Sequence, residues 1–173
     1  MTAAERAIAG AAICGAANAL LAARLSSGAV VALYAAKGSE VDTVQIDTFA
    51  RGCGLVVAYP RISGNARLLA FHVVQRDELA PARFGLREPS ADAPAVAVAD
   101  IAAFVVPGLA FDRAGGRIGW GRGHYDATFA AAAPSALRVG LAYECQLVEQ
   151  VAREAHDVAL NIIITEVATH VVV

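Results

Sequence analysis

Apolar runs and periodic apolar positions alternate along the chain, and they predict helices and strands in turn. The first stretch, up to about Leu25, is rich in alanine, the strongest helix former, and predicts a long first helix. Val41 to Arg51 has apolar residues at helical spacing before Gly52 and Gly54, so it predicts a second helix. Two further helices are expected at His124–Ala133 and Gln146–Arg153.

Short β-branched or uncharged runs lie between glycines and prolines and predict strands. Ile101–Val106 carries no charge and ends at Pro107, as expected of a strand covered on both faces. Pro60 is expected to stop the strand before it, and Pro81–Pro94 is expected to be a loop. The predicted strands are Ala29–Tyr34, Leu55–Ala58, Leu68–Val74, Ile101–Val106, Leu137–Ala142 and Leu160–Thr165, with Val171–Val173 as a candidate edge. This alternation predicts an α/β domain with a largely parallel sheet.

The composition raises a membrane question. The chain has 173 residues, of which 57% are hydrophobic and 17% charged, and residues 1–173 show no linker that would split them into two domains. Ala7–Ala23 is uncharged, but a spanning helix needs roughly 20 strongly apolar residues, and this stretch is mostly alanine and glycine with Asn18 in the middle. A signal peptide would need a positive start, and Glu5 cancels Arg6. We therefore expect a first helix packed on the sheet.

Charge and cysteine usage narrow the location and the partners. Cys14, Cys53 and Cys145 lie far apart without C-x-x-C spacing, which argues against a zinc ribbon or a disulfide framework and fits a reducing cytoplasm. The net charge is -2 and Lys37 is the single lysine, so there is no basic run to bind nucleic acid. We expect a cytoplasmic monomer or weak homodimer that binds neither nucleic acid nor a membrane.

The densest candidate chemistry lies in one glycine-rich segment, Pro107 to Asp126, which reads PGLAFDRAGGRIGWGRGHYD. Three alternating glycines let the backbone turn tightly and present N–H groups to an anion: Gly119, Gly121 and Gly123. Arg117 and Arg122 add positive charge, and the helix expected directly afterwards would point its N-terminus at the same anion. The G-x-G-x-G spacing matches neither the dinucleotide fingerprint nor a Walker loop. A tight turn without a ligand is the alternative, and the flanking arginines favour an anion site.

Two aspartates are candidate metal ligands. Asp126 is expected in the first turn of the helix, close enough to bound phosphates to hold Mg²⁺, although a helix-capping carboxylate is the alternative. Asp157 precedes the final predicted strand, in a loop of the kind that builds sites in α/β sheets. His124 and His156 lie beside these aspartates, but no ligand spacing requires a transition-metal site.

Several motifs in order resemble the 5-formyltetrahydrofolate cyclo-ligase family, also called methenyltetrahydrofolate synthetase. The motifs are YAAKGSEVDT, YPRI, LAFHVV, FGLREP, VVPGLAFDRAGGRIGWGRGHYD, VGLAYECQLVEQV and HDVALNIIITE. They extend from about Tyr34 to the C-terminus. The resemblance implies a single three-layer α/β/α domain, a requirement for ATP and Mg²⁺, and conversion of 5-formyltetrahydrofolate to 5,10-methenyltetrahydrofolate with release of ADP and phosphate.

The resemblance also implies roles for individual residues. The implied ATP-binding residues are Arg6, Arg117, Ile118, Gly119, Trp120, Gly121, Arg122, Gly123, His124 and Tyr125. The implied folate-binding residues are Glu40, Trp120, Gly121, Arg122, Gly123 and His124, and the implied magnesium ligands are Asp126 and Asp157. Arg117 and Arg122 are expected to serve catalysis, because phosphoryl transfer depends mainly on positioning and on neutralising charge. The implied reaction begins with attack of the N5-formyl oxygen on the γ-phosphate, followed by attack of N10 and loss of phosphate.

One departure from the family concerns the first helix. The family has a Lys-x-x-x-Arg element there, whereas this chain reads Thr2-Ala-Ala-Glu-Arg6, so Arg6 stands at the second position and the lysine is absent. The missing cation leaves a second hypothesis open, namely a non-catalytic paralogue that binds folate or nucleotide.

Overall fold

The computed structural model describes residues 1–64, 66–154 and 156–172. Its helices are α1 (Ala3–Arg24), α2 (Val44–Gly52) and α3 (His124–Ala131). Its strands are β1 (Val30–Ala32), β2 (Val56–Arg61), β3 (Ala70–Val73), β4 (Ala80–Pro81), β5 (Arg87–Glu88), β6 (Ala95–Val96), β7 (Ile101–Val106), β8 (Ala110–Asp112), β9 (Arg117–Ile118), β10 (Leu137–Leu141), β11 (Leu147–Val148), β12 (Ile162–Ile164) and β13 (Thr169–Val171). Short 3-10 turns are η1 (Arg76–Glu78), η2 (Arg83–Gly85), η3 (Val98–Asp100) and η4 (Glu144–Gln146).

The main sheet has eight strands in the order β13-β12-β10-β7-β1-β2-β3-β6. From β12 to β2 all neighbours pair in parallel. Both edges are antiparallel, with β13 on one side and β3 and β6 on the other. The prediction of an α/β fold with a largely parallel sheet is therefore confirmed for the centre, and the whole sheet is mixed.

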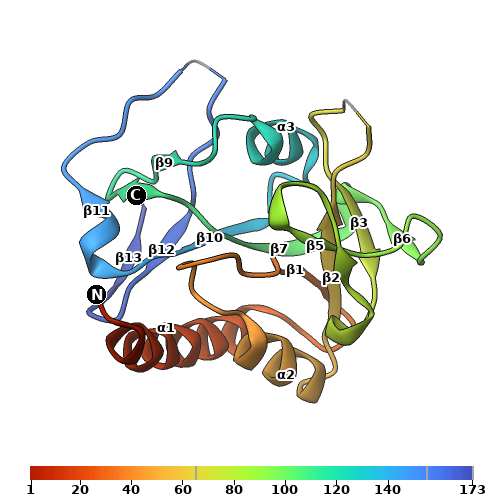
Figure 1. Cartoon of the computed structure of the whole chain (residues 1–173), viewed down its shortest axis with the longest axis horizontal. Coiled ribbons are helices and arrows are strands. Elements are labelled where there is room, and N and C mark those ends of the chain that lie inside the picture. The colour runs from red at the N-terminus through yellow and green to blue at the C-terminus, as the bar shows by residue number, and fades with distance from the viewer. Residues whose placement is uncertain (65, 155, 173) are drawn as a thin grey trace.

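Helices cover both faces of this sheet (Figure 1). α1 and α2 pack on one face, and α3 lies on the other together with a small sheet of order β11-β8-β9. Two hydrophobic cores result, one around Ile13, Leu21 and Ile46 beneath the sheet and one around Phe104 and Phe129 above it. The expected three layers are present.

The alanine-rich first segment forms the helix α1, as its sequence predicts, and side chains cap its N-terminus. Thr2 and Glu5 form a capping box, in which the Glu5 backbone N–H donates to Thr2 Oγ1 at 3.2 Å and the Thr2 backbone N–H donates to Glu5 Oε2 at 2.6 Å. By length and composition alone α1 is apolar enough to cross a membrane. Its buried positions, which include Ile13, Ala17 and Leu21, instead pack into the core on one face of the sheet.

The predicted end of β2 is wrong. Pro60 does not stop β2, which continues to Arg61 while Pro60 pairs with Phe71. β1 pairs with β2 only as far as Ala58, so beyond that point β2 has a partner on one side only and tolerates a residue without an N–H. An edge strand is present as β13, but it lies earlier than predicted and shares only Val171 with the predicted Val171–Val173, of which Val173 lies outside the described residues.

The predicted helix at Gln146–Arg153 is also wrong. The chain makes the turn η4 and then the strand β11, which pairs in parallel with β8. Beyond it the backbone N–H of Val151 donates to the buried carboxylate of Asp112. These contacts with a segment distant in sequence outweigh the local helical pattern.

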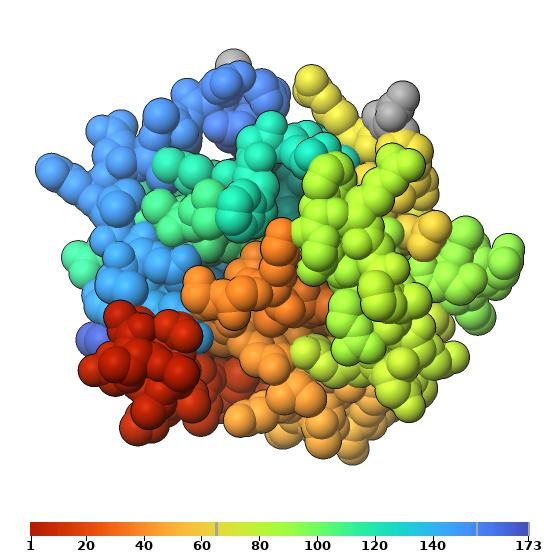
Figure 2. All heavy atoms as spheres, in the orientation of Figure 1, coloured from red at the N-terminus to blue at the C-terminus, as the bar shows by residue number. Residues whose placement is uncertain are grey.

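The order of the strands creates a topological switch point at the C-terminal ends of β1 and β7, and we call the region outside these ends the crevice. β1 and β7 are neighbours, yet the chain continues from β1 to α2 on one face and from β7 towards α3 on the other. Ligands of open α/β sheets bind at such a switch point. Figure 2 shows the segment after β1, in orange, meeting the yellow-green segment around η2 and the teal glycine-rich segment at the front of the molecule.

Candidate active site

The glycine-rich segment forms the start of the site. Gly121 has φ 74° and Gly123 has φ 64°, both in the left-handed region, and a Cβ at either position would meet nothing within 4 Å. α3 begins at His124, directly after Gly123 as its N-cap residue. Within the described residues, no side chain makes a capping hydrogen bond at this end of the helix. The first N–H groups of a helix have no partner within the helix, so the start of α3 is a candidate anion site.

Two arginines bring positive charge to this segment. The Arg117 side chain is 9% exposed, its Nη2 lies 3.5 Å from Asp126 Oδ2, and its Cζ lies 5.2 Å from the centroid of the Tyr125 ring. Arg122 reaches the other way, with its Cζ 3.9 Å from the centroid of the Phe84 ring. Both predicted catalytic cations therefore have partners within the protein.

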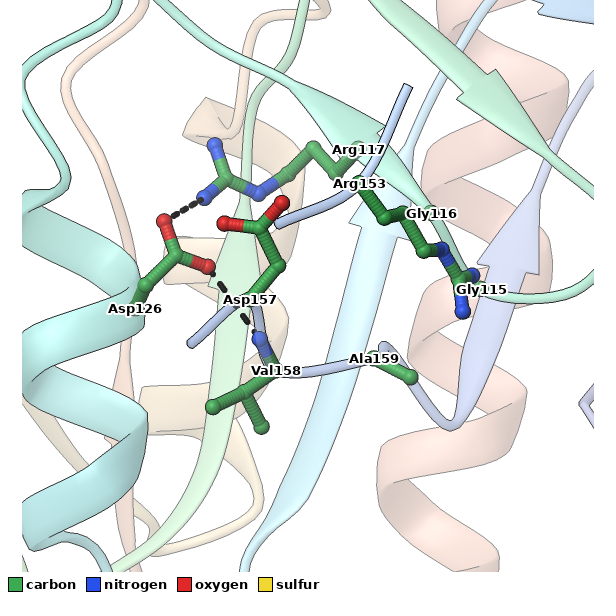
Figure 3. Close-up of a pocket in the computed structure, with 8 residues that line it drawn as sticks. All are labelled: Gly115, Gly116, Arg117, Asp126, Arg153, Asp157, Val158 and Ala159. Atoms are coloured by element: carbon green, nitrogen blue, oxygen red, sulfur yellow. Dashed lines mark hydrogen bonds and ion pairs between the residues drawn. The ribbon is translucent and has the colours of Figure 1, made fainter. Parts of the chain in front are cut away.

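Arg117, Asp126 and Asp157 come together at a narrow hollow (Figure 3). The other lining residues are Gly115, Gly116, Arg153, Val158 and Ala159. The enclosed volume is ≈ 10 Å³, about the space that one water or one ion occupies. The backbone N–H of Val158 donates to Asp126 Oδ1 at 3.4 Å, and that of Glu154 donates to Asp157 Oδ2 at 2.7 Å. Asp126 and Asp157, which are far apart in the sequence, therefore line the same hollow in the folded chain.

Two carboxylates, Asp126 and Asp157, and two guanidinium groups, Arg117 and Arg153, line the hollow. Mg²⁺ is commonly held by one or two carboxylates together with waters and phosphate oxygens, and Asp126 and Asp157 supply two carboxylates. Over the described ranges there is no group of three or more His, Cys, Asp or Glu side chains that could hold a metal ion. His156 faces solvent with 60% of its side chain exposed, and His124 Nδ1 lies 2.8 Å from the backbone oxygen of Arg67.

Glu40 reaches the glycine-rich segment from across the crevice. Its Oε2 accepts a hydrogen bond of 2.8 Å from the backbone N–H of Lys37. Burial raises the pKa of the Glu40 carboxyl, while the Lys37 N–H, the Trp120 indole and the Lys37 charge oppose the shift. The predicted folate contacts Glu40 and Trp120 are therefore neighbours.

Two tyrosines, Tyr34 and Tyr125, lie near enough to Glu40 for its charge to act on their hydroxyls. The Tyr34 hydroxyl donates to the backbone oxygen of Val41 at 2.6 Å. Burial raises the pKa of both Tyr34 and Tyr125, and the Glu40 carboxylate raises it further in each. Both hydroxyls are therefore neutral donors at physiological pH, and they adjoin the carboxylate that the sequence assigns to folate binding.

Asp112 organises the site, and the sequence analysis did not assign it a role. Its carboxylate accepts hydrogen bonds from the backbone N–H groups of Ala114, Gly116 and Val151 and pairs with Arg153 at 3.3 Å. Burial would raise the pKa of Asp112, but these donors outweigh it and lower that pKa. The available signal was an aspartate just before a Gly-Gly turn, a frequent place for a carboxylate that caps backbone N–H groups.

Three predicted ATP-binding residues, Gly119, Ile118 and Arg6, lie in different surroundings. Gly119 adjoins Arg117, because a Cβ there would meet Arg117 Nη1 at 2.8 Å. Ile118 is 41% exposed at the end of β9. Arg6 stands in the first turn of α1, and its Nη1 donates to the backbone oxygen of Met1 at 2.8 Å. Burial raises the pKa of Tyr143 and the Arg6 charge lowers it, so Arg6 lies near Tyr143, two residues after the end of β10.

The fold is a three-layer α/β domain in which the glycine-rich segment lies close to Glu40. The family model for the 5-formyltetrahydrofolate cyclo-ligase family matches residues 2–166. The chain is 32% identical over 144 residues to the 5-formyltetrahydrofolate cyclo-ligase of Mycolicibacterium smegmatis, covering 80% of this chain and 74% of that protein. It is 31% identical over 141 residues to the Escherichia coli protein of the same name, covering 78% and 76%.

Two solved structures with similar folds point to the same family. The 5,10-methenyltetrahydrofolate synthetase of Aquifex aeolicus superposes with a TM-score of 0.82 at 25% identity, covering 99% of this chain and 85% of that one. A Mycoplasma pneumoniae protein of the same name shares the fold, with a TM-score of 0.78 at 20% identity, covering 96% and 90%. The chain belongs to the 5-formyltetrahydrofolate cyclo-ligase family, and it is an enzyme of folate metabolism.

Proposed function

We propose that the chain catalyses the ATP- and Mg²⁺-dependent cyclisation of 5-formyltetrahydrofolate to 5,10-methenyltetrahydrofolate, with release of ADP and phosphate. The observation that carries the proposal is the crevice, where the glycine-rich segment with Arg117 and Arg122 faces Glu40. Anion-binding and folate-binding elements thus lie on its two sides, as a reaction between ATP and a folate requires.

The nucleotide would bind at the N-terminus of α3. The N–H groups after Gly123 would donate to phosphate oxygens, and the open space at Gly121 lets the phosphates approach the backbone. Arg122 would leave the Phe84 ring to neutralise charge that develops during phosphoryl transfer to the formyl oxygen. A formamide oxygen is a weak nucleophile and a poor leaving group, so activation by phosphate makes the cyclisation feasible.

Asp126 and Asp157 would hold the magnesium ion. When bound, Mg²⁺ neutralises phosphate charge and helps to orient the transferred group. Asp126 pairs with Arg117 in the protein alone, so a cation beside Asp126 would free the guanidinium for the phosphates. The ion-sized hollow supports this assignment.

The folate would lie against Glu40 and Trp120. Trp120 is 70% exposed and presents an aromatic face, which suits stacking with a flat pterin ring. The Glu40 carboxylate can accept hydrogen bonds from ring N–H groups, as carboxylates in polar pockets commonly do.

The test is formation of the methenyl chromophore by the purified chain. 5-Formyltetrahydrofolate is supplied with ATP and Mg²⁺, and absorbance of the product and release of ADP are followed together. We expect both signals to appear at the same rate and to disappear when ATP is omitted or EDTA is added. Thermal stabilisation by folate or ATP without any product, at enzyme concentrations near those of the substrate, would overturn the proposal.

Location and partners stay predictions. We infer a cytoplasmic enzyme that acts as a monomer or weak homodimer without nucleic acid or a membrane. Two of its three cysteines, Cys53 and Cys145, are exposed free thiols, which supports a reducing compartment.

A further inference from the structure

Lys37, the chain's single lysine, reaches across the crevice to two other segments. It lies between β1 and α2, and its ammonium donates to the backbone oxygen of Phe84 in η2. The same ammonium lies 5.5 Å from the centroid of the Trp120 ring in the glycine-rich segment. One charged group therefore connects its own segment with two others that come from distant parts of the sequence.

The contact with Phe84 supports an unusual backbone conformation. Phe84 has φ 60° and ψ 20°, and over the described residues it is the non-glycine residue with a positive φ. Such a conformation is unfavourable for a bulky side chain and persists where neighbours hold it. The Lys37 ammonium holds the carbonyl, and Arg122 stacks on the ring at 3.9 Å. The Lys37 stem also packs on the turn, since its Cε lies 3.5 Å from where a Cβ of Gly85 would stand.

The backbone of Lys37 orients Glu40 on the same side of the crevice. The Lys37 N–H donates to Glu40 Oε2 at 2.8 Å, and the Glu40 N–H donates to the Lys37 oxygen at 3.2 Å. This tight turn directs the Glu40 carboxylate towards the Trp120 indole. The main chain of Lys37 therefore fixes the acidic group, while its side chain reaches the aromatic residues.

We propose that Lys37 is a positioning residue of the folate site, which holds the Trp120 ring and the η2 turn in the places that receive the substrate. The inference rests on the proposed function. Lys37 acts through Trp120 and Phe84 and not by touching the reacting atoms. A site formed before the substrate arrives binds it without ordering these loops, so loss of the ammonium raises the KM for folate and leaves kcat nearly unchanged.

The chain offers a direct readout, because Trp120 is its single tryptophan. Lys37→Met keeps most of the stem and removes the charge and the donors. In Lys37→Met without any ligand, we expect the emission maximum of Trp120 to shift and its quenching by acrylamide to increase. The KM for 5-formyltetrahydrofolate should rise about tenfold, the effect of losing one hydrogen bond to a charged group, with kcat within about twofold of the parent.

Two further variants complete the test. Arg24→Met removes an exposed cation at the end of α1 and should match the parent in emission and in KM. Lys37→Arg keeps a cation and a donor, and it should restore the Trp120 emission and most of the affinity. Melting temperatures check that each variant is folded, and Lys37→Leu, which also removes the charge and the donors, replaces Lys37→Met if that variant does not fold.

Parental values of emission or of KM in Lys37→Met would overturn the proposal, because it requires the ammonium to act on folate through Trp120. If the parent chain forms no methenyl product, the proposed function fails. In that case Trp120 emission and the Kd for 5-formyltetrahydrofolate, measured by quenching of that emission, still test Lys37. The two failures are therefore distinguishable.

Discussion

The buried carboxylate of Asp112 accepts a hydrogen bond of 2.9 Å from the backbone N–H of Val151. Asp112 ends β8, just before the Gly115–Gly116 turn, and Val151 belongs to the segment that leads to Asp157. This one carboxylate therefore ties together the two segments that line the ion-sized hollow.

Asp112→Asn should destabilise the protein strongly. An amide retains one acceptor oxygen, but it turns an NH₂ group towards backbone donors and removes the charge that pairs with Arg153. Hydrogen bonds to a buried charged group are worth roughly 1.5–3 kcal/mol each, so we expect a loss of about 3 kcal/mol in the free energy of unfolding. Urea denaturation measures it. Asp100→Asn, at an exposed position, is the matched control and should change stability little.

Asp112 also predicts how stability depends on pH. Because its pKa is lower in the folded chain than its usual value of 3.8, ionised Asp112 stabilises the fold. That stability is fully present above the unfolded pKa and is lost as the pH falls through the folded pKa. The free energy of unfolding, measured by urea denaturation from neutral pH downwards, should fall more steeply below about pH 4 in the parent than in Asp112→Asn. Equal slopes would contradict the role assigned to this carboxylate.

Gly115→Ala should cost more stability than Gly28→Ala. Both glycines have a positive φ, 83° and 85°, so each substitution carries the left-handed strain of roughly 1–2 kcal/mol. A Cβ at Gly115 would also lie 2.6 Å from the backbone oxygen of Leu160, whereas one at Gly28 would meet nothing within 4 Å. Thermal or urea unfolding of Gly115→Ala and Gly28→Ala measures both losses. Their difference is the cost of the overlap with Leu160, because the backbone strain is similar in the two variants. Equal losses would show that the Gly115 turn can move away from Leu160.

Asp126→Asn should reduce activity while leaving the fold intact. Asp126 lines the hollow, but its contacts are one ion pair with Arg117 and one long hydrogen bond from Val158, so little stability depends on it. We expect kcat/KM to fall about a hundredfold and the Mg²⁺ concentration for half-maximal rate to rise, as for loss of a metal-binding carboxylate. A magnesium titration of activity, with melting temperatures alongside, measures both. Glu149→Gln removes an exposed carboxylate and serves as the control.

Arg122→Met should lower kcat more than it raises the KM for ATP. If Arg122 neutralises charge that develops in the transition state, its loss costs about a hundredfold in kcat, the size of effect seen for a single transition-state donor. Arg113→Met removes an exposed cation from the neighbouring turn and should behave like the parent. A variant that changes neither kinetic constant would remove Arg122 from the catalytic machinery.

Sequence patterns predicted those elements whose local signals agree with their surroundings. Ile101–Val106 was predicted residue for residue, because an uncharged run that ends at Pro-Gly has one favourable place, the middle of a covered sheet. The first helix likewise follows from alanine content, and its capping box stabilises its start. The Gln146–Arg153 helix failed because pairing of β11 with β8, and the bond from Val151 to Asp112, depend on residues far away in sequence.

By itself, the sequence determined the fold class and, through ordered motifs, the family, while the anion-binding character of the glycine-rich segment stays a prediction. These properties depend on residue types and short spacings, which local physical chemistry converts into helices, strands and exposed N–H groups. Only the tertiary structure decided that Asp126 and Asp157 share a hollow, that Asp112 joins its two walls, and that Lys37 meets Phe84 and Trp120. Such contacts depend on the order of strands in the sheet, because β1 and β7 become neighbours only when the whole chain has folded.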